Sequence, residues 1–191
     1  MHYNHFQGKK VRLRGRTSSD MENDLCKIEQ NEYDTEIDRL CDYVHLPNSA
    51  ESRRQSMEED IKRINRWDNC NLVIETLDCE AVGGITVTEA NMVNGTFSYG
   101  MGISRAHWRK GYAFEAIQLL LNYYFNELRF HKCNVTVYDY NEGSKELHKA
   151  LGFAEEGRLR ESKYSDGKFH DILLYGITAK EFNRQRKYPA S

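Results

Sequence analysis

The sequence predicts an α/β (α+β) sandwich, with a mixed, mostly antiparallel sheet of about seven strands and helices on both faces. Three observations lead to this prediction. Alternating segments typical of strands occur both before and after a strongly amphipathic helix that follows Gly111. Residues 20–68 are rich in charged residues and carry helical patterns. The final strand pattern is a hairpin, so strands and helices are mixed along the chain rather than segregated.

Length and composition limit the protein classes to consider. The 191 residues suffice for one domain with its own core, and we expect a single domain with tails at residues 1–8 and 183–191. With 27 basic and 29 acidic residues, the chain lacks the cationic excess of dedicated nucleic-acid or membrane-surface proteins. The five cysteines show no CxxC or Cys/His spacing, which favours reduced thiols over a disulfide framework or a metal site. No signal-peptide or membrane-spanning run is visible, so we expect a cytoplasmic protein.

The first half of the chain predicts a strand, a helical region and a three-stranded meander. The segment "KKVRLRG", residues 9–15, alternates apolar and charged residues like a strand. Ser19 and Glu22 have capping-box spacing, and two helical stretches divided near "HLPNSAES" are expected within residues 20–68. The segments "NLVIET", "AVGGITVTE" and "TFSYGMGI" then read as strands, the last two joined by a tight turn at Asn94-Gly95. These strands predict an antiparallel meander.

The second half predicts a helix, a strand, a short helix and a hairpin. After Gly111, apolar residues recur at steps of three or four as far as Leu128, so one face of this helix should pack on the sheet. The segment "NVTVYDY" alternates as a strand, and "SKELHKALGF" predicts a short helix that ends at Gly152. The segments "GRLRESKY" and "FHDILLYGI" form a hairpin across residues 165–168.

The stretch "HWRKGYAFEA", residues 107–116, places two cations and a glycine directly before a helix. The first turn of a helix has free N–H groups and the positive end of the macrodipole, which suits a phosphate, and Gly111 would allow a close approach. Taken alone, solvated cations before an ordinary helix explain the pattern equally well. Gly111 is followed by Tyr112 rather than by the Lys of a P-loop, so nucleoside triphosphate hydrolysis is not supported.

Three longer segments, "YGMGISRAHWRKGYAFEA", "YDYNEGSKELHKALGFAEEGRLRES" and "DGKFHDILLYGI", occur in this order. Together they resemble the GNAT superfamily of acetyl-CoA-dependent N-acetyltransferases, in the branch with the ribosomal-protein alanine/serine and spermidine N-acetyltransferases. The resemblance implies the GNAT fold, acetyl-CoA as cofactor and CoA as product. It also implies direct attack by a primary amine on the acetyl group and, as often in this family, a homodimer.

The resemblance further implies which residues bind the cofactor. The strand before the loop would polarise the thioester carbonyl and hold the pantetheine arm, and the helix after Asn141 would contact the cofactor's far end. Trp108 stands where the superfamily's pyrophosphate loop usually has Gln or Arg, a departure that changes little because such a loop works mainly through backbone N–H groups. The implied cofactor residues are Met101, Gly102, Ile103, Trp108, Arg109, Lys110, Gly111, Tyr112, Ala113, Asn141 and Ser144.

The groups that would handle protons are less clearly marked. His148 stands where many family members carry a Tyr that reprotonates the departing thiolate, although a His on a short helix is more often solvent-facing or locally hydrogen-bonded. Ser98 stands where relatives often have a Glu that acts as the general base. Glu89 is then the next candidate for the base, directly or through water, unless it is simply an exposed carboxylate. None of the five cysteines is expected near the thioester, which argues against a covalent route.

The family implies that the first two helices and the last hairpin wall the acceptor site. Residues 20–42 carry nine acidic residues against Lys27 and Arg39, which favours a polyamine, another small cationic amine or a peptide N-terminus, unless these acids are only solvated helix faces. The alternative is a non-catalytic acyl-CoA sensor, which is favoured because Ser98 and His148 replace the usual Glu and Tyr. A nucleic-acid module would rest on Arg105, Arg109 and Lys110, and the acidic balance argues against it.

Overall fold

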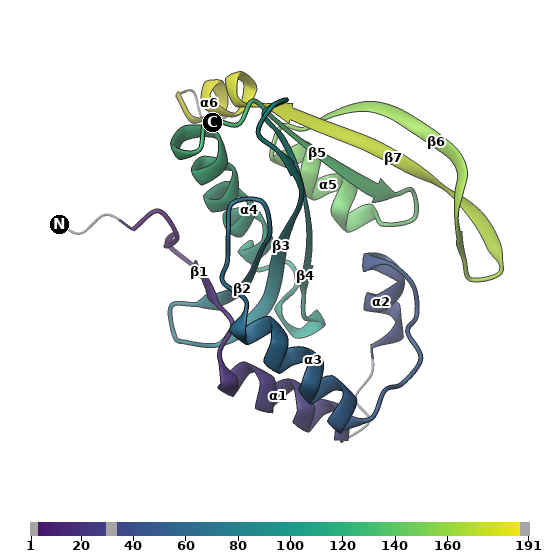
Figure 1. Ribbon diagram of the computed structural model, residues 1–191. Coiled ribbons are helices and arrows are strands. Elements are labelled where there is room, and N and C mark those ends of the chain that lie inside the picture. Colours follow the sequence, from purple (N-terminus) through teal and green to yellow (C-terminus); the bar gives the residue numbers. More distant parts are fainter. Residues whose placement is uncertain (1–3, 30–33, 188–191) are drawn as a thin grey trace.

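The computed structural model describes residues 4–29 and 34–187, apart from the side chains of residues 26–29 and 186–187. Figure 1 shows the helices and strands in chain order. They are β1 (Val11–Gly15), α1 (Ser18–Glu29), α2 (Thr35–Cys41), α3 (Ala50–Lys62), β2 (Cys70–Thr76), β3 (Ala81–Asn91), β4 (Thr96–Ile103), the 3₁₀ turn η1 (Arg105–His107), α4 (Tyr112–Asn122), the π-helical turn η2 (Tyr123–Glu127), β5 (Lys132–Tyr138), α5 (Glu142–Ala150), β6 (Ala154–Ser165), β7 (Lys168–Thr178) and α6 (Ala179–Lys187). None of the described helices is long and apolar enough to cross a membrane.

The seven strands form one sheet in the order β1-β2-β3-β4-β5-β7-β6. All neighbouring strands run antiparallel except β4 and β5, which confirms the predicted mixed, mostly antiparallel sheet. The parallel pair is short, because only residues 96–98 of β4 pair with residues 132–134 of β5. Beyond Ser98 the two strands diverge, as Figure 1 shows.

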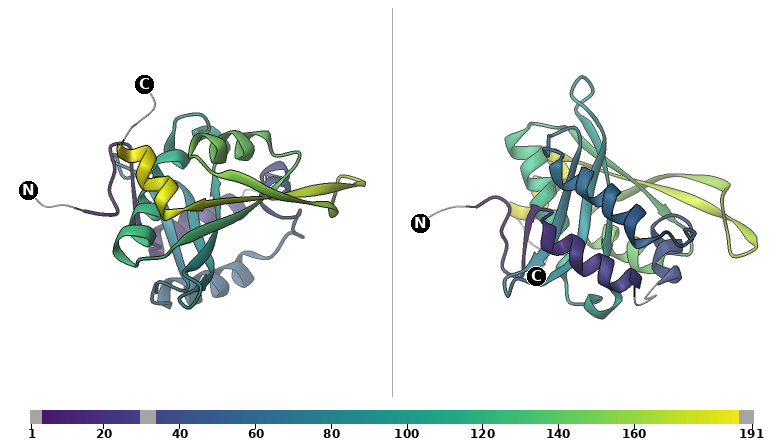
Figure 2. Two further views of the ribbon diagram at one scale, coloured as in Figure 1. Left: turned by 90° about the horizontal axis from the view of Figure 1, so that it is seen from above. Right: turned by 60° about the horizontal axis from the view of Figure 1, so that its bottom comes forward.

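Helices cover both faces of the sheet, as predicted. Val11 and Leu13 of β1 are buried in the same core cluster as Ile117 of α4. Side chains alternate across a strand, so Arg14 points to the opposite face, where it binds Asp20 of α1. On that face α1 and α3 pack side by side around a small cluster of Met21, Leu25 and Met57 (Figure 2).

The helical region between residues 18 and 62 differs from the prediction, because it contains three helices rather than two. Side-chain caps begin both α2 and α3. Asp34 Oδ1 accepts from the N–H of Ile37 at the start of α2, and Ser49 Oγ accepts from the N–H of Ser52 at the start of α3. The predicted capping box at Ser19 and Glu22 is wrong. Asp20 instead accepts from the N–H and hydroxyl of Thr17, at distances of 2.7 and 2.8 Å.

Residues 1–3 and 188–191 of the predicted tails lie outside the described residues, and the remaining parts lie next to β1 and within α6. At the C-terminus the chain is helical as far as Lys187, because Thr178 and Glu181 form a capping box and Phe182 is buried. At the N-terminus Gln7 bridges to Arg12 in a turn that leads into β1.

The hairpin, the meander and the helix after Gly111 agree with the sequence. Asp166 and Gly167 have positive φ values of 51° and 81°, as a tight hairpin turn requires.

Candidate active site

A cleft of about 500 Å³ lies where β4 and β5 separate. Its walls are the end of β4, the loop before α4, α5 along its length and one side of α2. Ten of the eleven residues predicted to bind the cofactor line it, although they come from three separate segments: Met101, Gly102, Ile103, Trp108, Arg109, Gly111, Tyr112, Ala113, Asn141 and Ser144. Lys110 does not line this cleft but lines a neighbouring hollow. The structure thus brings the predicted set together, while their cofactor contacts stay a prediction.

The loop before α4 has an unusual backbone on either side of Lys110. Arg109 and Gly111 both have positive φ, 61° and 81°, and Gly111 is the N-cap of α4. Two structural contacts hold the loop. The Trp108 indole N–H donates to the carbonyl of Ile103 at 2.7 Å, and the Arg109 guanidinium reaches Glu146 of α5 at 2.9 Å. A helix N-terminus held in this way offers its first N–H groups and positive dipole end to an anion in the cleft.

The inner edge of β4 faces the cleft without a neighbouring strand. Met101 and Gly102 pair with β3 on one side, while the pairing with β5 has already ended at Ser98. The free edge therefore offers backbone N–H and C=O groups for hydrogen bonds with an elongated ligand.

His148 lies in the floor of the cleft, 5% exposed. Its Nδ1 is 2.8 Å from the carbonyl oxygen of Ser144, and its Nε2 is 2.9 Å from the hydroxyl of Tyr99. Because a carbonyl can only accept, Nδ1 carries the hydrogen and Nε2 accepts from Tyr99. Burial lowers the pKa of His148, although the bond to Ser144 opposes this. The imidazole is therefore neutral at neutral pH.

Sequence reasoning missed Tyr99. A signal existed, since Tyr99 lies two residues before Met101 and thus on the same side of β4.

The two residues considered for the base lie elsewhere. Ser98 Oγ donates to Glu89 Oε2 at 3.2 Å, so these side chains contact each other. Glu89 occupies an irregular part of β3, with a φ of 51° where the register with β4 shifts. Neither residue lines the cleft described here.

One cysteine lies in the cleft, close to the end of β4 that is predicted to face the thioester. Cys41 of α2 lines the cleft, and its Sγ is 4.0 Å from the carbonyl oxygen of Met101. Burial raises the pKa of its thiol, and the neighbouring Asp38 and Asp42 raise it further. Because the thiolate is the nucleophilic form, a raised pKa makes Cys41 a weak nucleophile. A protonated Cys41 disfavours a covalent route, although the residue lies in the cleft.

Ion pairs fix α2 across the cleft. The Arg105 guanidinium binds Asp34 at 2.7 and 2.8 Å and Glu36 at 2.8 Å, which ties the start of α2 to η1. At the other end Lys163 of β6 binds Asp42 at 3.0 Å. The side of α2 that faces the cleft carries Ile37, Leu40 and Cys41, none of which the sequence had indicated.

Most of the acidic run is neutralised within the chain. On α1, Asp20, Glu22 and Asp24 pair with Arg14, Arg54 and Arg16. The acids at both ends of α2 pair as described above, and the side chains of Glu29 and Glu32 lie outside the described residues. This pattern favours the interpretation of these acids as partnered helix faces over that of a free anionic wall. Arg105 and Arg109, on which a nucleic-acid surface would depend, are likewise paired with carboxylates.

Comparisons with known proteins agree with this geometry. The family model described as "Acetyltransferase (GNAT) domain" matches residues 10–154. The chain is similar to the "SPbeta prophage-derived uncharacterized N-acetyltransferase YokL" of Bacillus subtilis (strain 168), with 36% identity covering 78% of this chain and 82% of that protein. It is 27% identical to the "Putative ribosomal N-acetyltransferase YdaF" of the same organism, over 75% and 79% of the two chains. The spermidine N-acetyltransferase from Vibrio cholerae, solved with CoA and spermine, shares the fold with a TM-score of 0.74 at 20% identity, over 92% and 99% of the two chains.

Proposed function

We infer the reaction from one premise: the chain belongs to the family of acetyltransferase (GNAT) domains. It is an acyltransferase, with N-acetyltransferase activity of the GNAT type. We propose that acetyl-CoA is the donor, that CoA leaves as the product, and that a primary amine attacks the acetyl carbonyl directly.

One observation carries this proposal: the end of β4, the loop before α4 and the start of α5 converge on a single cleft. The N-terminus of α4, with Gly111 as its N-cap, suits the pyrophosphate of the cofactor. The free edge of β4 at Met101 and Gly102 suits the amide groups of the pantetheine arm. The acetyl group would then lie deeper in the cleft, between β4 and α2, where backbone N–H groups can stabilise the developing oxyanion.

The environment of His148 bears on how the thiolate is reprotonated. The only N–H of the neutral ring is bound to Ser144, and its Nε2 already accepts from Tyr99. Its lowered pKa disfavours the cationic form that would have a proton to give. We therefore propose that water in the open cleft protonates the thiolate, and that His148, held by Tyr99, is a structural part of the cleft floor. In the same way water would accept the proton of the amine, since positioning supplies the larger part of such a rate enhancement.

The acceptor is proposed from two classes. YdaF is named for ribosomal N-acetylation and the Vibrio enzyme for spermidine, so a protein N-terminus and a polyamine are the acceptors to compare. The pairing of the acids around α2 removes the simple charge argument for the polyamine.

The test measures the release of free CoA from acetyl-CoA, and thiol titration detects the CoA. The acceptor panel contains spermidine, spermine, an aminoglycoside and short peptides that begin with Ala, Ser or Met. We expect turnover with one class, and the class that reacts identifies the acceptor. Binding of acetyl-CoA without turnover on any acceptor would contradict the proposal and would favour a sensor of acyl-CoA.

A further inference from the structure

A second hollow, of about 360 Å³, lies beside the loop before α4. It is lined by the turn that leads into β1, by the turn after β2 and by the loop itself, with three lysines: Lys9, Lys10 and Lys110. Tyr112 lines both this hollow and the cleft, so the two adjoin at the N-terminus of α4.

The position of the lysines is fixed by contacts between segments about a hundred residues apart. The Glu115 carboxylate of α4 accepts from the backbone N–H groups of Lys9, Lys10 and Val11, at 2.9, 2.7 and 2.8 Å. The Lys10 ammonium donates to the carbonyl of Lys110 at 2.9 Å. These bonds hold the turn before β1 against the loop, so Lys9 and Lys10 stand beside Lys110 because of the fold and not because of the local sequence.

The charge of this hollow is not balanced. Within the described part of the chain none of the three lysines forms an ion pair, whereas Arg105 and Arg109 beside the same loop are both paired with carboxylates. One carboxylate, that of Asp78, lines the hollow with them. The carboxylate of Glu115 is occupied by backbone N–H groups. Three ammonium groups against the carboxylates of Asp78 and Glu115 still leave a net excess of one positive charge directly beside the loop.

We propose that this hollow binds the 3′-phosphate of the CoA moiety, an inference that rests on acetyl-CoA as the proposed cofactor. With the pyrophosphate at the N-terminus of α4, the ribose attached to it lies next to the loop, and its 3′ position carries a phosphomonoester. Such a group bears about −1.5 to −2 charges at pH 7 and three acceptor oxygens. Lysines act as point charges toward phosphate, which suits a set of flexible ammonium groups around an open hollow.

The experiment compares CoA with 3′-dephospho-CoA, which differ only in this phosphate. Calorimetric titration at low salt is performed on the wild type, on the double variant Lys9→Gln/Lys110→Gln, and on the control Lys168→Gln/Lys180→Gln. The control removes two exposed lysines far from the loop, so it matches the change in net charge. Lys10 is left in place because it also holds the loop.

We expect the wild type and the control to bind CoA about tenfold more tightly than 3′-dephospho-CoA, since each exposed charge pair contributes up to about fivefold. In the double variant the preference should fall close to one, because CoA should lose far more affinity than 3′-dephospho-CoA. The preference should also fall as salt is added.

Three outcomes would overturn the inference. Equal wild-type affinity for both ligands would exclude a 3′-phosphate site while leaving the cofactor assignment intact. An equal loss for both ligands in the double variant would assign the lysines to the general field of the loop. Failure of the wild type to bind either ligand would contradict the proposed cofactor itself.

Discussion

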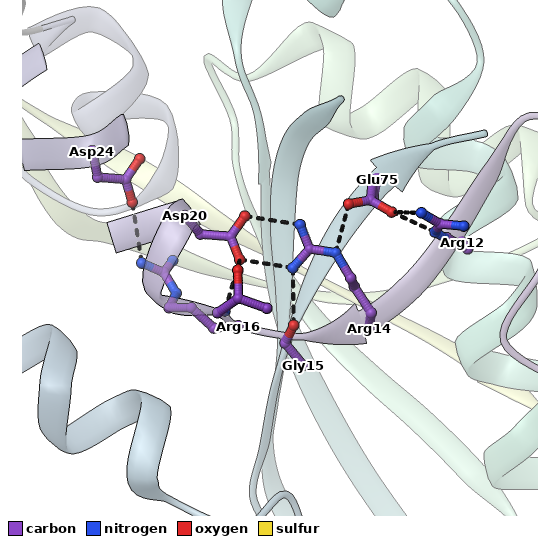
Figure 3. Close-up of polar contacts among 8 residues, drawn as sticks. Arg12, Arg14, Gly15, Arg16, Asp20, Asp24 and Glu75 are labelled. Carbon is purple, nitrogen blue, oxygen red and sulfur yellow. Dashed lines mark hydrogen bonds and ion pairs between the residues drawn. The ribbon is translucent and has the colours of Figure 1, made fainter. Parts of the chain in front are cut away.

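Replacement of Asp20 by Asn tests how strongly α1 is fixed to the sheet. The Asp20 carboxylate is 7% exposed and accepts two hydrogen bonds from the Arg14 guanidinium, at 2.7 and 2.8 Å (Figure 3). Arg14 in turn donates from Nε to Glu75, at 2.6 Å, and Arg12 binds the other oxygen of Glu75. The bonds from Arg14, and after them those from Thr17, outweigh burial and lower the pKa of Asp20 from 3.8 to about 2.

This pKa shift sets both the size and the pH dependence of the effect. A difference of nearly two pKa units, at roughly 1.4 kcal/mol per unit, corresponds to about 2–3 kcal/mol of stability. Because the pKa is lower in the folded state, the stabilisation is complete above pH 3.8 and is lost as the pH falls toward 2. At pH 3 about 1 kcal/mol of it should already be lost.

The assay is urea unfolding of the wild type and of Asp20→Asn at pH 7, 4 and 3. We expect the variant to be less stable by about 2–3 kcal/mol at pH 7, with the difference reduced by about 1 kcal/mol at pH 3. Glu22→Gln is the matched control, because Glu22 lies on the same helix and pairs with Arg54 at the surface, where such pairs contribute little. A difference between wild type and Asp20→Asn that does not change between pH 7 and pH 3 would refute the reasoning.

Three further predictions concern the cleft. Gly111→Val should lower acetyl-CoA affinity at least about tenfold, because a φ of 81° costs a β-branched residue roughly 1–2 kcal/mol and the loop must move. Gly167→Val, at the same φ in the hairpin turn, controls for backbone strain. Equal affinity for acetyl-CoA in the two variants would contradict the assignment of the loop. His148→Phe should leave kcat within about threefold of the wild type if water protonates the thiolate, whereas a loss of a hundredfold or more would restore its role as the acid. Arg105→Gln should raise the KM for acetyl-CoA by up to about fivefold, since it frees the start of α2. Limited proteolysis of this variant should show faster cleavage near α2. An unchanged KM and an unchanged cleavage pattern would show that the ion pairs do not hold α2 in place.

The strands and the loop before α4 could be predicted because their signals are local. Alternation of apolar residues identified β1 and β5, turn signals delimited the other strands, and Gly111 next to an amphipathic helix identified the loop. The parallel pairing of β4 with β5 could not be read from alternation, because it depends on where α4 returns the chain. The cleft exists because this pairing stops at Ser98, which is a tertiary property.

The residues that the sequence did not indicate lie in the cleft or beside it because the fold brings distant segments together. Cys41 was set aside because no motif surrounds it, yet α2 carries it to within 4.0 Å of the Met101 carbonyl. Tyr99 was not singled out within its strand, and only the position of α5 makes it the partner of His148. Lys9 and Lys10 precede the first strand, and Glu115 brings them to the loop. Each of these depends on a contact between segments distant in sequence, for which the chain carries no local pattern.

The acidic run shows that the sign of charge in a sequence does not determine the field at a site. A cationic acceptor that approached α2 would meet carboxylates already bound to Arg105 of η1 and Lys163 of β6. Such an acceptor would gain only the difference between its own pairing and the pairing that it displaces, and at exposed positions this difference is small. It would also release α2, whose apolar side lines the cleft. Selection among amines should therefore depend more on the shape between α2 and the β6–β7 hairpin than on the number of acidic residues there.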